Sequence, residues 1–219
     1  MSVYTTLQER IKAFELSDIY PVISSEFCVS NNPAATLESI LSGGAKVVQM
    51  REKNMADRKF LELLKTARIL TDKFNALLIV DDRVDLALAS DADGVHLGQD
   101  DMPLREARKI APELLLGTST HNLEEVIAAQ HEECSYLNIG PIFKTGTKTL
   151  SMNPLGVDLF SELARQVKCP FSVMGGIKFD HLPELKKRGA KHIAAVTAFT
   201  ASDDPRREVE KWIKLFQQS

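Results

Sequence analysis

The chain has 219 residues, of which 44% are apolar and 26% are charged, and its formal net charge at pH 7 is −3. This composition is typical of an ordinary globular protein, and the length allows one large α/β domain or two small ones. A slightly acidic chain lacks the basic surface that a nucleic-acid backbone requires, so a nucleic-acid binder is not expected. No apolar run reaches the roughly 18 residues that span a membrane, and the polar first residues lack the core of a signal peptide. We therefore expect a cytoplasmic protein with no membrane partner.

The three cysteines, Cys28, Cys134 and Cys169, are widely spaced and form no C-x-x-C pair. An odd number without such pairing fits reduced cytosolic thiols better than a disulfide framework or a zinc site. We expect these thiols to be buried and structural.

Apolar runs of strand length recur along the whole chain. There are eight of them, at residues 20–23, 46–50, 76–80, 94–97, 114–117, 136–139, 171–174 and 192–196. Segments with helical spacing separate the runs; Phe60, Leu64 and Ala67, for example, share one face of a helix. Strands that alternate with helices predict parallel neighbours joined by right-handed crossovers, and continuous apolar strands fit a sheet that is buried on both faces.

The ends of several helices can also be predicted. Residues 5–16 predict an extra amphipathic helix before the first strand, and residues 205–217 predict a closing helix. Asn32 before Pro33 predicts a helix cap with proline in the first turn, and Gly43 and Gly44 predict the end of that helix. Pro21 is unusual within a strand because it removes a hydrogen-bond donor, so we expect it among the first residues of its strand.

Eight strands are the number that closes a barrel, and no linker, internal repeat or low-complexity tract divides the chain. An open doubly wound sheet usually has fewer strands and often a glycine-rich first turn, which is missing here. We therefore expect residues 1–219 to form a single (β/α)8 TIM-barrel domain with an extra N-terminal helix.

A basic cluster follows the second predicted strand. Side chains alternate along a strand, so Gln49, Arg51 and Lys53 are expected on one face, with Met50 and Glu52 on the other. An amide and two cations on one face can bind an anion, and a guanidinium can bind phosphate through two parallel hydrogen bonds. A solvated strand end with an Arg–Glu ion pair is the alternative interpretation.

Paired aspartates follow the third and fourth predicted strands, as Asp81 with Asp82 and Asp100 with Asp101. Carboxylates at neighbouring strand ends repel by about 4 kcal/mol for unit charges 4 Å apart at an effective dielectric constant of 20. Mg²⁺ relieves such repulsion and commonly binds one or two carboxylates together with substrate phosphates. The alternative interpretation is that one aspartate of each pair caps the following helix, and this alternative is strongest for Asp81 and Asp100.

Polar and glycine-rich segments follow the later strands. The loop 144–148, Lys-Thr-Gly-Thr-Lys, offers hydroxyls, a glycine and two lysines for phosphate contact, although an ordinary solvated loop has the same composition. Gly175-Gly176 and Val196-Thr197 follow the seventh and eighth strands, where barrels commonly bind phosphate through backbone N–H groups.

A serine and two histidines lie near the fourth and fifth strands. Ser119 and His121 do not form a convincing nucleophile pair, because they are close together on a loop and no orienting acid is evident. Ser119 is better suited to donate a hydrogen bond to a phosphate oxygen. His96 lies in an apolar run, so we expect a core residue with satisfied hydrogen bonds rather than a metal ligand.

In this order the clusters resemble one family, thiamine-phosphate synthase, also called thiamine-phosphate pyrophosphorylase. The segments VVQMREK, DDRVDLAL, DGVHLGQDDMP, GTSTH, IGPIFKTGTK and GGI carry the resemblance, which covers about residues 20–205. It implies a (β/α)8 fold and a Mg²⁺-dependent joining of hydroxymethylpyrimidine diphosphate to a thiazole phosphate, with release of pyrophosphate. It also makes a homodimer more plausible.

The resemblance also implies a role for each matching residue. Arg51, Lys53, Lys148 and Ser119 match the catalytic residues. Among them Arg51 and Lys53 bind the pyrimidine diphosphate together with Gln49, and Ser119 and Lys148 contact the diphosphate. Asp82 and Asp101 match the metal ligands, and Asp81 takes the position beside the pyrimidine. Thiazole-phosphate contacts are matched by Thr145, Thr147, Gly176, Val196 and Thr197.

The chain departs from the family pattern at three places. Asp81 stands where the family usually has Asn, and Ser24-Ser25 replaces Thr-Asp after the first strand. Thr197 replaces a more usual Ser. These differences concern substrate affinity more than the class of reaction.

Three other functions fit parts of the sequence. A thiazole tautomerase of the same fold would use His121 as its acid or base but would need no diphosphate or metal site. A non-catalytic regulatory barrel would bind thiamine intermediates without forming product. A phosphosugar barrel enzyme usually needs a catalytic lysine inside a strand, and Lys46 is the one candidate.

Overall fold

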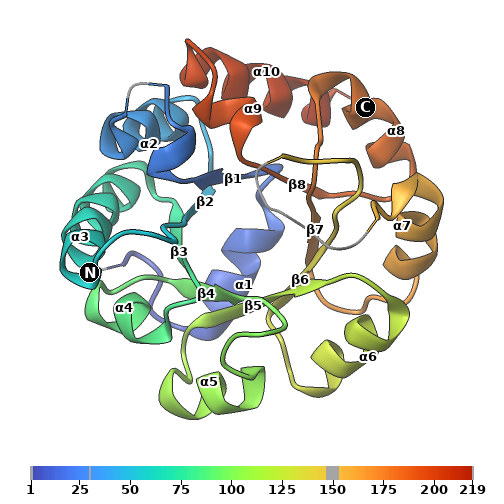
Figure 1. The fold of residues 1–219 in the computed structure, drawn as a ribbon, viewed down its shortest axis with the longest axis horizontal. Helices are drawn as coiled ribbons and strands as arrows, with labels where there is room; N and C mark the ends of the chain where they lie inside the picture. Colours follow the sequence, from blue (N-terminus) through green and yellow to red (C-terminus); the bar gives the residue numbers. More distant parts are fainter. Residues whose placement is uncertain (1, 30, 147–152, 219) are drawn as a thin grey trace.

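The computed structural model describes residues 2–29, 31–146 and 153–218, and eight parallel strands form a closed barrel in chain order (Figure 1). The strands are β1 (Ile19–Ile23), β2 (Val47–Met50), β3 (Leu77–Asp81), β4 (Gly94–Leu97), β5 (Leu115–Thr120), β6 (Tyr136–Ile139), β7 (Phe171–Val173) and β8 (His192–Ala195). The predicted (β/α)8 barrel is confirmed, and each predicted strand overlaps an observed one.

Helices surround the barrel and alternate with its strands (Figure 1). They are α1 (Leu7–Glu15), α2 (Pro33–Ser42), α3 (Asp57–Phe74), α4 (Val84–Ala89), α5 (Leu104–Ile110), α6 (Leu123–His131), α7 (Gly156–Ala164), α8 (Leu182–Lys187), α9 (Thr197–Thr200) and α10 (Pro205–Gln217), with 3₁₀ turns η1 (Ser25–Phe27) and η2 (Phe179–His181). The extra N-terminal helix and the closing helix are both confirmed.

The predicted cap of α2 is also confirmed. The side chain of Asn32 accepts a hydrogen bond from the backbone N–H of Ala35, and Pro33 is the first residue of the helix. Gly43 is the C-terminal cap residue. The capping side chain and the proline at the first position together fix where this helix begins.

Side chains divide between two apolar cores because they alternate along each strand. Val48 and Met50 of β2 belong to the core between the strands and the helices. Val47 instead belongs to a core inside the barrel, so the next residue of this parity, Gln49, also points inward. The predicted opposite orientation of Gln49 and Met50 is thereby supported.

The N-terminal mouth of the barrel is covered by α1, which Figure 1 shows crossing behind the ring of strands. Phe14 of this helix is fully buried and stacks on Tyr136, with ring centroids 4.4 Å apart. The same ring packs against Tyr20 at 5.8 Å and against His192 at 5.0 Å. Since α1 fills this mouth, the C-terminal mouth remains for ligands, as is usual in barrels of this kind.

The expected position of Pro21 is wrong. It is the third of five residues in β1 rather than one of the first. It is aligned with Ala195, where the register between β1 and β8 ends, and the register with β2 begins at Val22. Pro21 therefore stands where β1 changes from one neighbour to the other, which is a position that tolerates a missing donor better than the middle of a ladder.

The expected burial of the cysteines is confirmed for Cys28, which is 4% exposed. Cys134 and Cys169 are only partly buried, and their sulfur atoms lie 3.8 Å apart. All three are free thiols. No disulfide framework therefore involves them.

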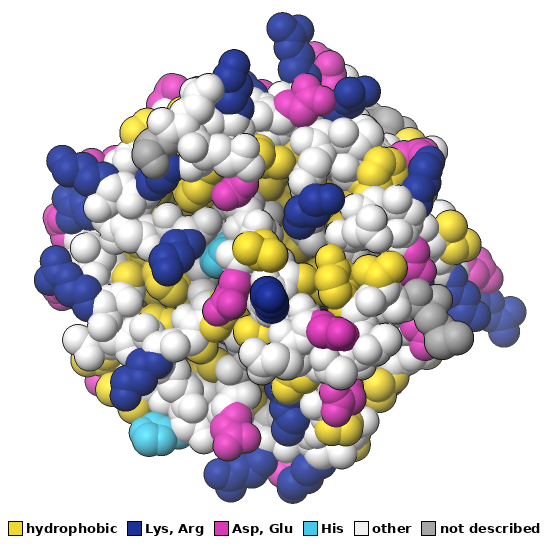
Figure 2. All heavy atoms as spheres, turned by 180° about the vertical axis from the view of Figure 1, so that it is seen from behind, with side chains coloured by type: hydrophobic (Ala, Val, Ile, Leu, Met, Phe, Trp, Pro, Cys, Tyr) yellow, Lys and Arg dark blue, Asp and Glu magenta, His cyan; other side chains and the backbone are white. Residues whose placement is uncertain are grey.

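The exposed surface carries both signs of charge. Figure 2 shows Lys and Arg side chains interspersed with Asp and Glu over one face of the molecule. Among the described helices, none combines the length and the apolar character that a membrane span needs.

Candidate active site

The C-terminal ends of the strands bring most of the predicted site residues to one mouth of the barrel. Each of these residues lies in the last part of a strand, in the loop that follows it or at the start of the next helix. They are Gln49 in β2, Arg51 and Lys53 after β2, Asp81 at the end of β3, Asp82 after β3, Asp101 after β4, Ser119 in β5, Thr145 after β6, Gly176 after β7, Val196 after β8, and Thr197 at the start of α9. Thr147 and Lys148 lie outside the described residues.

Asp81 pairs with the two cations that follow β2. Its Oδ2 lies 3.1 Å from Lys53 Nζ and 3.4 Å from Arg51 Nε. Burial raises the pKa of Asp81, although Lys53 and Arg51 oppose this rise. The proposed helix-capping role of Asp81 is wrong, because it is the last residue of β3 and α4 has no side-chain cap. Sequence reasoning failed here because the carboxylate turns into the barrel instead of toward the helix.

Asp82 and Asp101 form a second acidic group beside Lys53. Lys53 contacts the Asp82 carboxylate, and the carboxylates of Asp81 and Asp82 raise the pKa of Lys53 although burial works against its charge. Asp101 Oδ2 accepts a hydrogen bond from the backbone N–H of Gly98 at 2.7 Å. Burial and the neighbouring Asp82 nevertheless raise the pKa of Asp101.

The backbone of Asp82 is held in an unusual conformation. Its φ is 59°, in the left-handed region that aspartate enters more readily than most residues. Its N–H donates to the carbonyl of His96 at 2.8 Å. This contact ties the backbone of the residue after β3 to β4, the strand that precedes Asp101.

These two carboxylates fit a Mg²⁺ site. Both offer the hard oxygen atoms that this ion prefers, and the raised pKa of Asp101 reflects burial together with a repulsion from Asp82 that a divalent cation would relieve. No group of three or more His, Cys, Asp or Glu side chains forms a metal site in the described ranges. Two protein ligands would leave positions for phosphate oxygens and water, which Mg²⁺ usually retains.

Gln49 is an orphaned polar side chain inside the barrel. The residue is 3% exposed, and its Nε2 has no hydrogen-bond partner among residues 2–29, 31–146 and 153–218. Buried polar groups are nearly always paired, so this amide N–H is available to donate a hydrogen bond to a ligand.

Ser119 and the two nearby histidines have separate partners. Ser119 Oγ lies 3.0 Å from His96 Nε2, and His121 Nδ1 lies 2.7 Å from Glu125 Oε2. His96 is 6% exposed and its Nδ1 lies 3.1 Å from the Tyr136 hydroxyl, so the prediction of a satisfied core histidine is confirmed. No hydrogen bond between Ser119 and His121 is found within the described residues, in line with the rejection of a nucleophile pair.

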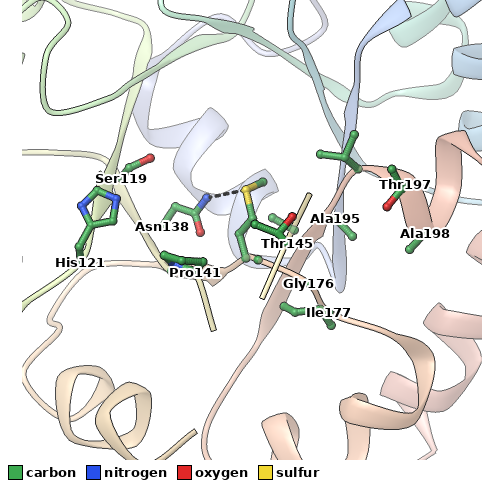
Figure 3. Close-up of a pocket in the computed structure, with 15 residues that line it drawn as sticks. Ser119, His121, Asn138, Pro141, Thr145, Gly176, Ile177, Ala195, Thr197 and Ala198 are labelled. Carbon is green, nitrogen blue, oxygen red and sulfur yellow. Dashed lines mark hydrogen bonds between the residues drawn. The ribbon is translucent and has the colours of Figure 1, made fainter. Parts of the chain in front are cut away.

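A pocket lined by no Lys, Arg, Asp or Glu among the described residues, called the uncharged pocket below, lies between the ends of β5 and β8 (Figure 3). Ser119, Asn138, Thr145, Gly176 and Thr197 are among the residues that line it. Gly176 has φ +62°, and a Cβ there would lie 2.3 Å from the carbonyl oxygen of Lys144. Only glycine therefore allows this loop to approach the loop after β6 so closely.

The sequence analysis missed some polar residues of the site. Asn138 lines the pocket and is 5% exposed, and its position two residues after the inward-facing Tyr136 was the available signal. Its Nδ2 lies 3.6 Å from Met174 Sδ, the contact drawn in Figure 3. Ser25 was noted only as a departure, and its N–H and hydroxyl both donate to Glu52 Oε1, at 2.7 and 2.6 Å.

Lys46 does not contribute to this mouth. It precedes β2 and is exposed, and its Nζ donates to the backbone carbonyl of Phe74 at 3.3 Å. A phosphosugar enzyme that uses this lysine as its catalytic base is therefore excluded.

The fold and the mouth together define a class, the (β/α)8-barrel proteins that have cations and carboxylates at the C-terminal ends of the strands. The model of the family described as "Thiamine monophosphate synthase" matches residues 19–199. The chain belongs to the thiamine-phosphate synthase family, whose members are transferases that join a pyrimidine diphosphate to a thiazole phosphate.

Named relatives agree with this assignment. The chain is 36% identical over 216 residues to thiamine-phosphate synthase from Caldicellulosiruptor saccharolyticus, with 97% of this chain and 98% of the relative covered. It is 44% identical over 170 residues to thiamine-phosphate synthase from a Synechococcus strain, covering 77% of this chain but 48% of that longer protein.

Solved structures give the same result. Thiamine phosphate pyrophosphorylase from Pyrococcus furiosus superposes with a TM-score of 0.87 at 35% identity, covering 94% of this chain and 98% of that one. A 3-hexulose-6-phosphate synthase superposes with a TM-score of 0.63 at 14% identity, which reflects the shared barrel alone.

Proposed function

We propose that this chain condenses 4-amino-2-methyl-5-hydroxymethylpyrimidine diphosphate with a thiazole phosphate to give thiamine phosphate and pyrophosphate. The observation that carries the proposal is the division of one mouth into two parts. Arg51, Lys53, Asp82 and Asp101 form a charged part, and the pocket that contains Gly176 forms an uncharged part. Ser119 lies at the pocket's edge. Two adjacent compartments of different character suit two different substrates.

The charged part would bind and release the diphosphate. Arg51 and Lys53, together with Lys148, would donate hydrogen bonds to its oxygen atoms and stabilise the negative charge that grows on departing pyrophosphate. The carbon–oxygen bond to the methylene breaks, and both electrons leave with pyrophosphate. Mg²⁺, held by Asp82 and Asp101, would supply further neutralisation of that charge when bound.

The pyrimidine ring would lie over the buried polar groups of β2 and β3. The unpaired Nε2 of Gln49 can donate to a ring nitrogen, and Asp81 can accept from the ring amino group. As the bond breaks, the methylene becomes cationic, and a carboxylate close by favours that cation. The two side chains therefore both orient the ring and stabilise its charge.

The uncharged pocket would hold the thiazole phosphate, with Thr145, Thr147, Gly176, Val196 and Thr197 as its contacts. The thiazole nitrogen donates its electron pair to the methylene carbon and forms the new carbon–nitrogen bond. No protein nucleophile is needed for this reaction. The barrel contributes by holding the two rings in line and by excluding water that would capture the cation.

A coupled assay tests the proposal. The purified chain is incubated with both substrates, with each substrate alone, and with both substrates after removal of divalent cations by a chelator, and pyrophosphate and thiamine phosphate are measured. We expect both products in equal amounts only when both substrates and Mg²⁺ are present. Failure to form either product under the complete conditions would refute the proposal.

A thiazole tautomerase remains the second candidate because of one observation. His121 lines the uncharged pocket, and its Nδ1 lies 2.7 Å from Glu125 Oε2, an arrangement that suits an acid or base. A tautomerase would convert one thiazole carboxylate phosphate isomer into the other without the pyrimidine substrate. A non-catalytic regulatory barrel would bind the ligands in calorimetry and form no product.

The remaining features of the proposal concern the whole protein. We propose that residues 1–219 act as one barrel domain, that the protein works in the cytoplasm, and that it forms a homodimer. Sedimentation of the purified chain tests the last point, with a monomer as the contrary result.

A further inference from the structure

Four side chains of four different strands form a connected series of hydrogen bonds across the barrel interior. The hydroxyl of Tyr20 on β1 lies 2.8 Å from the hydroxyl of Tyr136 on β6, which lies 3.1 Å from His96 Nδ1 on β4. His96 Nε2 lies 3.0 Å from Ser119 Oγ on β5, at the edge of the pocket. The series thus runs from the barrel core to a residue that faces the ligand.

The barrel makes room for this series at one position. Gly117 of β5 is paired with both His96 and Tyr136 in the sheet register. A Cβ at Gly117 would lie 2.0 Å from Cζ and 2.3 Å from the hydroxyl oxygen of Tyr136. The tyrosine hydroxyl can reach the imidazole only because residue 117 has no side chain.

The burial of Tyr20 determines which hydroxyl donates in the hydrogen bond between Tyr20 and Tyr136. Tyr20 is 1% exposed, and in the described part of the chain its hydroxyl has Tyr136 as its single hydrogen-bond partner. A buried O–H group without an acceptor is costly, whereas an unused oxygen lone pair is cheaper. Tyr20 therefore donates to Tyr136, and burial raises the pKa of both tyrosines, so both hydroxyls keep their protons.

The donor and the acceptor in each of the other hydrogen bonds follow from this first bond. Tyr136 accepts from Tyr20 and donates its own proton to His96 Nδ1, which must therefore be unprotonated. A neutral imidazole then carries its proton on Nε2 and donates it to Ser119 Oγ. With that lone pair occupied by His96, the serine proton points elsewhere, and the pocket is the open direction.

We propose that Tyr20, Tyr136 and His96 are positioning residues that hold His96 as its Nε2–H tautomer and thereby present Ser119 to the ligand as a hydrogen-bond donor. If each hydrogen bond of the series ran in the reverse direction, the Tyr20 hydroxyl would have no acceptor. Ser119 would then donate to His96, and its oxygen lone pairs would face the anion. The identity of that anion, the diphosphate, rests on the proposed function, but the tautomer does not.

The tautomer can be measured without substrate. Long-range ¹H–¹⁵N correlation spectra of the ¹⁵N-labelled full chain report the protonation of each imidazole nitrogen, and the His96→Gln variant identifies the His96 signals. We expect Nδ1 to appear as a bare nitrogen and Nε2 as a protonated one. A proton on Nδ1, or on both nitrogens, would overturn the proposal.

Binding of inorganic pyrophosphate, measured by calorimetry in the presence of Mg²⁺, tests the consequence for Ser119. We expect Tyr136→Phe to weaken binding about tenfold, equivalent to about 1.4 kcal/mol, and Tyr20→Phe to weaken it about twofold. Tyr4→Phe is the matched control, because the Tyr4 hydroxyl is exposed and donates to the Asn75 carbonyl at the opposite mouth. Its binding should equal that of the parent chain.

A double-mutant cycle separates positioning from general damage to the barrel. In a Ser119→Ala background there is no serine proton to orient, so Tyr136→Phe should cause no further loss of pyrophosphate binding. An equal loss with and without the Ser119 hydroxyl would show a purely structural role and overturn the proposal. The expected tautomer in a chain that forms no thiamine phosphate would refute the proposed function and leave this inference standing.

Discussion

The two mouths of the barrel differ in how their charged and polar side chains are paired. At the N-terminal mouth the fully buried Asp93 has several partners: its Oδ2 accepts from Arg68 Nη1 at 2.7 Å and from the backbone N–H of Leu78 at 2.8 Å. At the C-terminal mouth Asp82 and Asp101 repel each other, and Gln49 Nε2 has no partner in the described ranges. One mouth thus stabilises the fold, whereas the other keeps like charges and an unpaired amide N–H at a cost in stability, as is common at functional sites.

The largest expected effect is at the N-terminal mouth. Phe14→Ala removes a fully buried ring that stacks on Tyr136, so the free energy of unfolding should fall by about 3–5 kcal/mol. Urea denaturation measures the loss. The control Leu16→Ala changes a side chain that is 74% exposed and should lie within about 0.5 kcal/mol of the parent. Unchanged stability in Phe14→Ala would contradict the stabilising role of the N-terminal mouth.

The pH dependence of stability gives the second test at this mouth. Burial lowers the pKa of His192 from 6.5 to about 4, so the unfolded chain takes up a proton below pH 6.5 while the folded chain stays neutral. Stability from this residue is present above pH 6.5 and is lost as the pH falls toward 4, by about 3 kcal/mol.

Urea denaturation of the parent and of His192→Asn at several pH values between 7 and 4 measures this loss. The relevant quantity is the difference between the two chains in the free energy of unfolding. The asparagine can still donate to the Ser17 carbonyl that His192 Nδ1 contacts. The stability advantage of the parent over the variant should shrink steadily with acid. His131→Asn, at an exposed position in α6, should parallel the parent throughout. Parallel curves for His192→Asn would contradict the assignment.

At the C-terminal mouth the charged part should dominate catalysis. Asp82→Asn keeps a residue that tolerates the left-handed backbone but removes one carboxylate, and we expect turnover to fall at least ~100-fold with little change in stability. Pyrophosphate release measures turnover. Asp85→Asn, which removes an exposed partner of Arg83 on α4, should retain normal turnover. Similar turnover in both variants would argue against the metal-binding role of Asp82.

The uncharged part should show a smaller and more selective effect. Gly176→Ala forces a Cβ against the Lys144 carbonyl, so the KM for the thiazole phosphate should rise about tenfold while the KM for the pyrimidine diphosphate changes little. Gly189→Ala is the control, since its φ of +98° imposes similar strain but no heavy atom lies within 4 Å of the added Cβ. An equal rise in both KM values would mean that the two parts do not bind separate substrates.

Much of the fold was predictable because local pattern and tertiary structure agree. Residues 205–217 were predicted as a helix and form α10 with the same bounds, since Asp204 caps it and Pro205 starts it. Strand β5 was predicted to end at residue 117 and continues to Thr120, because the polar Ser119 and Thr120 still pair with β6. Apolar runs show which residues are buried, but they do not mark where pairing between strands ends.

The site was predictable where strand ends converge and unpredictable where a contact depends on the register between two strands. The grouping of Arg51, Lys53 and Asp82 follows from parallel topology alone, and their contacts support it. The contact between His96 and Ser119 depends on the register between β4 and β5, which no local pattern encodes. The inward directions of Asp81 and Asn138 follow instead from alternation along β3 and β6, a signal that the sequence offered and that was not used.

The position of Phe14 has a consequence for how the chain is made. Its ring is synthesised before β1, yet its stacking partner Tyr136 belongs to β6 and leaves the ribosome much later. Contacts between such distant parts of a chain slow folding, and until they form, apolar surface stays exposed to aggregation. A nascent chain that ends before β6 lacks Tyr136, so Phe14 and its side of α1 stay exposed until that strand has been synthesised.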